Sequence, residues 1–192
     1  MQIISKMDKK LSDTIVMSWR CMSHAFRSMD TLITVIATPI MMMIMFVYVF
    51  GGAINTGSID YIDFVVPGIV IMCIASGTAY TGVRLNNDMT KGIIDRFRSM
   101  PISKSSILGG HVLTSVIFNG FSVVLVMLSA LLMGFRTNAG ITEWFLVIAI
   151  LLLYTLAMTW ISIAFGLLAN SVEGAVAYSY LFLFLIFLIT MQ

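Results

Sequence analysis

Long uncharged, apolar runs alternate with short polar segments along most of the chain. Reading from one charged residue to the next gives five runs of 19 to 31 residues, which cover 31–59, 64–83, 105–135, 144–172 and 174–192. About 20 apolar helical residues span a hydrocarbon core roughly 30 Å thick, so each run is long enough to cross a bilayer. Because lipid offers no hydrogen-bond partners to open backbone, we expect these runs to be helices.

The pattern predicts an all-α polytopic membrane protein that forms one transmembrane domain over residues 1–192. Of its residues, 59% are apolar and 10% are charged, which excludes an ordinary soluble domain. An amphipathic helix is expected at 12–28 and a cytoplasmic loop at 84–105. The five spans are expected at about 31–54, 62–83, 106–134, 144–169 and 174–192.

The segment 12–28 has the periodicity of an amphipathic helix. Trp19, Met22 and Phe26 recur at helical spacing, whereas Arg20 and Arg27 fall largely on other faces. Such a helix is typical of one that lies in the headgroup layer before the chain enters the membrane. A packed helix of a small cytoplasmic cap is the alternative.

Basic residues are distributed unevenly and predict the orientation. Five of the eleven Lys and Arg residues precede the first span, and five lie between the second and third spans. Because basic residues in short loops favour the cytoplasmic side, we expect the N-terminus and the 84–105 loop to be cytoplasmic. Two cysteines, Cys21 and Cys73, predict neither a disulfide framework nor a metal framework.

The usual catalytic motifs are missing from the sequence. There is no Walker-type phosphate loop, no zinc-protease motif and no nucleophile elbow, so we expect no catalytic residue. Nucleic-acid binding is not expected either, because topology explains the basic residues. His111 and Asn119 in the third span form a candidate intramembrane polar site, although a lone His or Asn more commonly joins two helices by a hydrogen bond.

The loop 86–106, which reads NNDMTKGIIDRFRSMPISKSS, is the most informative segment. Met89, Ile93 and Phe97 recur near helical spacing, and Pro101 is expected to end the helix. A short amphipathic helix over 86–100, which carries both charge signs between two spans, is suited to docking a soluble partner. A solvated loop that only fixes orientation remains equally open from this segment alone.

Together with the predicted topology, the second span and this loop resemble the membrane subunit of type-2 ATP-binding cassette (ABC) exporters. The resemblance runs from about residue 12 to the end of the chain. The loop residues that match that family by type are Asn87, Asp88, Lys91, Gly92, Asp95, Arg96, Met100, Pro101 and Ile102, and the entry into span two matches at Asp63, Phe64, Val65, Val66, Pro67 and Gly68. The family normally has six spans, and this chain stops in the fifth.

The resemblance implies a non-catalytic permease subunit in the cell membrane of a prokaryote. A separate nucleotide-binding ATPase subunit would bind ATP and Mg²⁺, and a second permease subunit would complete the pathway. The substrate is expected to be amphipathic or apolar, such as a drug or lipid. Carried onto this sequence, the family's ATPase-coupling loop corresponds to Asp88, Gly92, Asp95, Arg96, Phe97 and Pro101.

Two other classes of function remain open at this point. A secondary carrier would need an intramembrane ion or proton site, for which His111 and Asn119 are the candidates. A membrane-embedded lipid enzyme would need clustered acids or histidines at the interface, whereas Asp88 and Asp95 lie about two helical turns apart among basic residues.

Overall fold

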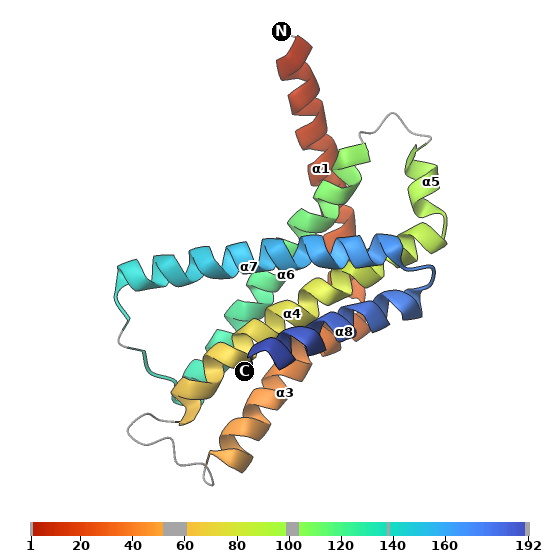
Figure 1. Cartoon of the computed structure of the whole chain (residues 1–192). Helices are drawn as coiled ribbons and strands as arrows, with labels where there is room; N and C mark the ends of the chain where they lie inside the picture. Colours follow the sequence, from red (N-terminus) through yellow and green to blue (C-terminus); the bar gives the residue numbers. More distant parts are fainter. Residues whose placement is uncertain (1, 52–60, 99–103, 138, 191–192) are drawn as a thin grey trace.

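The computed structural model describes residues 2–51, 61–98, 104–137 and 139–190, and these residues are helical apart from short turns (Figure 1). The predicted all-α bundle is therefore confirmed. Its elements are α1 (Gln2–Arg27), α2 (Met29–Leu32), the π-helix η1 (Ile33–Ala37), α3 (Thr38–Met45), the π-helix η2 (Phe46–Phe50), α4 (Tyr61–Thr90), α5 (Ile93–Arg98), α6 (Lys104–Leu132), α7 (Ile141–Leu168) and α8 (Val172–Thr190).

The segment from Met29 to Phe50 is one helical run in which α-helical and π-helical turns alternate. Pro39 stands in the first turn of α3, where a helix does not need its missing N–H group. The Thr38 hydroxyl donates to the backbone oxygen of Ile33 at 3.0 Å. Wider π-helical turns precede and follow α3, so the run continues past the proline without a break.

Helix α4 is the centre of the bundle and packs against α6, α7 and α8 (Figure 1). The N-terminal helix α1 packs mainly on α6. Because α4 contacts most other long helices, a movement of α4 would displace the helices packed against it.

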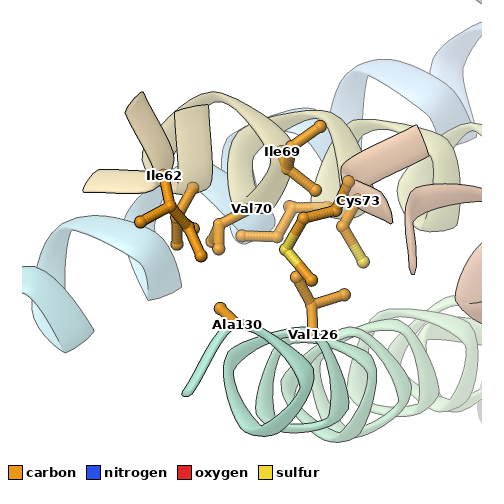
Figure 2. Close-up of a cluster of buried hydrophobic side chains, with 9 residues drawn as sticks. Ile62, Ile69, Val70, Cys73, Val126 and Ala130 are labelled. Atoms are coloured by element: carbon orange, nitrogen blue, oxygen red, sulfur yellow. The ribbon is translucent and has the colours of Figure 1, made fainter. Parts of the chain in front are cut away.

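The main apolar core lies between α3, α4 and α6 (Figure 2). Val70 and Cys73 of α4 face Val126 and Ala130 of α6, and Met43 of α3 is fully buried in the same cluster. Lipid is as apolar as these side chains, so their contribution in a membrane comes from close packing and dispersion, and less from the hydrophobic effect.

Helices α4 and α7 touch backbone to backbone at a pair of glycines. A Cβ atom on Gly82 would overlap the backbone oxygen of Ser162, and one on Gly166 would overlap the backbone oxygen of Gly82. The absence of a side chain therefore allows these two helices to cross closely, as small residues do in membrane helices.

Among the described residues, three helices, α4, α6 and α7, are long and apolar enough to cross a membrane, and the shorter apolar stretch Ile33–Val49 lies in the first predicted span. The five-span count itself stays a prediction. The first ten residues of α7, 141–150, are all exposed. We call the end of the bundle that carries Arg20, Arg84 and Arg96 the basic end.

Candidate functional site

At the basic end, α4 continues as a helix through Thr90 before the chain turns at Lys91 and Gly92. Gly92 has a φ of +67°, the left-handed conformation that glycine adopts readily and other residues rarely do. The single helix predicted over 86–100 is therefore wrong, because the left-handed turn divides it into the end of α4 and the short α5.

The structure places the predicted coupling residues in different parts of this segment. Asp88 lies in the last turns of α4 and is partly buried, whereas Gly92 and Arg96 are exposed. Asp95 and Phe97 belong to α5, but their side chains are outside the described part of the structure, as is Pro101 altogether. Their coupling role stays a prediction.

Asp88 joins three helices through its carboxylate. Its Oδ2 atom lies 3.8 Å from Nη1 of Arg20 on α1 and 3.7 Å from Nε2 of His111 on α6. The side chain of Asp88 is 20% exposed and that of His111 is 6% exposed, so the second contact is largely shielded from solvent. Asp88 thus connects the segment before α5 to both α1 and the start of α6.

Arg84 and Cys21 complete this group, which we call the Asp88 cluster: Arg20, Cys21, Arg84, Asp88 and His111. The Arg84 guanidinium donates from Nη2 to the backbone oxygen of Cys21, and Sγ of Cys21 lies 3.9 Å from Nε2 of His111. Burial raises the pKa of the Cys21 thiol. The two helices α1 and α4 are therefore linked by polar contacts from both Arg84 and Asp88.

Asn86 is a site residue that sequence reasoning missed. Its side chain is 1% exposed, and Nδ2 donates to the backbone oxygens of Gly166 at 2.9 Å and Ala169 at 2.6 Å. The last carbonyl groups of a helix have no partner within the helix, so Asn86 caps the end of α7. The basic end of α4 is thereby attached to α7 as well as to α1 and α6.

The face of α1 that packs on α6 differs from its predicted apolar stripe. The buried residues are Met17, Ser18, Cys21 and Ala25, whereas Trp19 is 69% exposed and Met22 is intermediate. In a membrane protein an apolar stripe can face lipid, so the face packed against protein need not be the most apolar one.

Close packing of α1 on α6 depends on Gly110, because a Cβ atom there would lie 2.7 Å from Cβ of Met17. Phe26, the third residue predicted for the interfacial helix, also reaches α6. Its ring makes edge-on contacts with Phe118 at 5.3 Å and Phe121 at 5.5 Å between centroids. These contacts anchor the C-terminal end of α1 against α6, while the exposed Trp19 remains available to the membrane interface.

The structure places His111 and Asn119, the candidate intramembrane polar site, in two different sets of contacts. His111 belongs to the Asp88 cluster, whereas Asn119 donates from Nδ2 to the Ser115 backbone oxygen at 2.8 Å. The Ser115 hydroxyl in turn lies 2.9 Å from that of Thr159 on α7. Asn119 therefore belongs to a separate set of hydrogen bonds, in which its own donations stay within α6 and the Ser115 hydroxyl makes the link to α7.

An apolar groove of about 520 Å³ lies at the opposite end of the bundle, between α4, α6 and α7. Its lining is apolar except for Thr137 and is made by Val66, Pro67, Val70, Ile71, Val123, Val124, Met127, Leu128, Leu131, Phe135, Thr137, Ala139, Trp144, Val147, Ile148 and Leu151. This volume is in the range of small-molecule sites.

The described helices form an apolar bundle of the kind found in polytopic membrane proteins, and the central helix α4 ends in a turn that leads into the short α5. The chain belongs to the ABC-2 type transporter family, whose pattern matches residues 12–190. The resemblance noted from the loop and the second span is thereby confirmed.

One relative is the daunorubicin resistance ABC transporter permease protein DrrB1 of Streptomyces coeruleorubidus. The two are 32% identical over 164 residues, which cover 85% of this chain and 58% of the relative. The chain thus spans little more than half the length of that relative. No solved structure matches the chain.

Proposed function

We propose that this chain is the permease subunit of an ABC exporter, with ATP and Mg²⁺ bound by a separate ATPase subunit. Membership of the ABC-2 family and the similarity to a drug-resistance permease support this function. The observation that supports the docking site is the Asp88 cluster, because it connects the end of α4, next to α5, with α1 and α6. A force on α5 would thereby be transmitted to α4, α1 and α6.

The docking surface consists of the α4–α5 turn and α5. Lys91, Gly92 and Arg96 are exposed there, and the turn projects from the end of the bundle (Figure 1). A basic surface suits an ATPase face that offers carboxylates, and charge complementarity of this kind selects partners and speeds their encounter.

The proposed orientation places the basic end and the N-terminus in the cytoplasm of a bacterial cell. The concentration of Lys and Arg before α2 and between α4 and α6 supports this side. ATP is available there, so the docking surface and the ATPase would share one compartment. The groove between α4, α6 and α7 would then open toward the outer leaflet.

Two permease subunits would enclose the translocation pathway, and the substrate would be amphipathic or apolar. The relative's name associates it with resistance to daunorubicin, which supports a drug as substrate. An ATP-dependent change in the bound ATPase can move α5 only if the ATPase contacts the docking surface differently in its two states.

The test is capture of an ATPase subunit from native membranes in mild detergent, identified by mass spectrometry. We expect the unaltered chain to retain a nucleotide-binding protein and the Arg96→Asp variant to lose it. Arg136→Asp is the matched control, because it reverses another exposed arginine at the opposite end of the bundle.

Equal loss in both variants would indicate a general effect of charge on the protein and would remove the docking surface from the proposal. No captured nucleotide-binding protein from a folded, unaltered chain would contradict the exporter function itself.

A further inference from the structure

The apolar groove has the length and position of one membrane leaflet. On α6 its lining runs from Val123 to Leu131, about 12 Å of helix at roughly 1.5 Å per residue. Half of a hydrocarbon core about 30 Å thick is about 15 Å. Trp144 lines the end of the groove away from the basic end, and tryptophan favours the membrane interface. The groove therefore extends from that interface toward the middle of the bilayer.

The groove is open to the membrane along α7. Val147 and Ile148 line it from the stretch 141–150 of α7, whose residues are all exposed. Hydrocarbon is the material that surrounds a membrane-spanning helix, so an acyl chain can enter the groove sideways without loss of a hydrogen bond.

A positive charge lies at the interfacial end of the groove. Arg136 is flanked in sequence by Phe135 and Thr137, which both line the groove, and its own side chain is exposed. The backbone N–H of Arg136 donates to Oδ1 of Asp63 at 3.4 Å, which attaches this turn to the start of α4. Within the described residues, no carboxylate forms an ion pair with the Arg136 guanidinium.

We propose that the groove binds an anionic phospholipid, with one acyl chain between α4, α6 and α7 and the phosphate on Arg136. An arginine guanidinium binds phosphate oxygens through paired N–H groups, and basic residues near a membrane surface attract anionic lipids. The assignment to the outer leaflet rests on the proposed function, because that function places the basic end in the cytoplasm.

Two other occupants fit the groove less well, a cationic drug because of its charge and an extended peptide because of its backbone hydrogen-bonding groups. A cationic amphipathic drug would meet the guanidinium of Arg136 at the mouth of the groove, and like charges repel. A peptide segment in extended form would carry backbone groups into a lining with a single polar side chain, Thr137, and these groups would lack partners. The negative charge of Asp63 opposes an anionic headgroup, so its removal offers an independent test of the charge argument.

The experiment uses Trp144 as a reporter of the lipid in the groove. Trp19 and Trp160, both more than half exposed, are replaced by Phe so that Trp144 is the remaining tryptophan. The full chain is placed in nanodiscs that mix phosphatidylglycerol and phosphatidylcholine, with brominated acyl chains on one lipid at a time. Quenching of Trp144 fluorescence then gives the preference for the anionic lipid.

We expect a preference for phosphatidylglycerol of about fivefold, as one favourable basic contact with an anionic lipid confers. Arg136→Gln should reduce the preference to near unity, and Asp63→Asn, which keeps the oxygen acceptor, should increase it. Val124→Phe should reduce quenching by both lipids because Val124 lines the groove. Ile117→Phe is its control, two turns away on α6 and exposed but outside the lining.

An unchanged preference in Arg136→Gln would overturn the headgroup assignment, and equal quenching in Val124→Phe and Ile117→Phe would overturn the groove assignment. If neither brominated lipid quenches Trp144, protein fills the groove, and the proposal is wrong. ATPase capture by the same variants is measured separately. If the unaltered chain captures no ATPase but shows the lipid preference, the result counts against the proposed function and leaves the lipid site intact.

Discussion

The side-chain nitrogen of Asn86 lies 2.6 Å from the backbone oxygen of Ala169, so a residue near the end of α4 caps the end of α7. The partners are 83 residues apart in the sequence. Together with the Asp88 cluster, this contact fixes the basic end of α4 on two sides.

Replacing Asn86 with alanine should destabilise the bundle by about 1 to 3 kcal/mol, because two buried helix-end carbonyls lose their donor. Thermal unfolding in detergent measures the effect. Asn87→Ala is the control, since Asn87 is only partly buried and no hydrogen bond of its side chain is described. Equal unfolding temperatures for the two variants would contradict the capping role.

Asp88→Asn should reduce drug-stimulated ATP hydrolysis by the assembled transporter several-fold while leaving ATPase capture intact. The substitution keeps the side-chain volume but weakens the link from α4 to α1 and α6. Arg20→Gln should have a smaller effect, because the Arg20 side chain is 42% exposed and such pairs contribute about 0 to 1 kcal/mol. If Arg20→Gln reduced ATP hydrolysis more than Asp88→Asn did, Asp88 would not be the main link between α4 and the helices α1 and α6.

Gly82→Ala should destabilise the α4–α7 contact by about 1 to 3 kcal/mol, because the added methyl group overlaps the backbone of Ser162. Gly68→Ala on the same helix is the matched control. A Cβ atom there meets nothing within 4 Å, so it should be neutral or slightly stabilising. Unfolding by detergent titration compares the stabilities of the two variants. Similar stabilities would argue against close packing of α4 on α7 at Gly82.

Cys21 should react slowly with maleimide at neutral pH in the folded protein. Burial raises the pKa of its thiol, so the reactive thiolate is scarce, and the rate should still be rising above about pH 8.5, where a free thiol is half ionised. Ser12→Cys in a Cys21→Ala background is the exposed control on the same helix. Equal labelling rates at the two positions would show that α1 does not pack on α6 at Cys21.

The helical fold follows from features that lie close together in the sequence. Uncharged runs of membrane length predicted α4, α6 and α7, and the turn at Gly92 lies within the loop that the charge pattern identified. The single helix expected over 86–100 was wrong because a glycine that fits helical spacing gives no sign of its own φ angle. Spacing reports which residues share a face and says little about a single left-handed residue.

The contacts between helices were harder to predict. The partners of Asn86 lie 80 and 83 residues away, so nothing near it in the sequence distinguishes it from Asn87. The packed face of α1 was missed because hydrophobicity marks a buried face in water, whereas in a bilayer Trp19 can face the interface and Ser18 can face protein. Pairing of His111 with Asp88 also required the three-dimensional structure.

The left-handed turn at Gly92 has a mechanical consequence. Helix α5 leaves the axis of α4 at this residue, so a force on α5 acts at a distance from that axis (Figure 1). Such a force produces a torque on α4, and the capped end of α7 and the three-helix Asp88 cluster resist it from different sides. The membrane half of α4 would accordingly receive a twist in place of a push along its length.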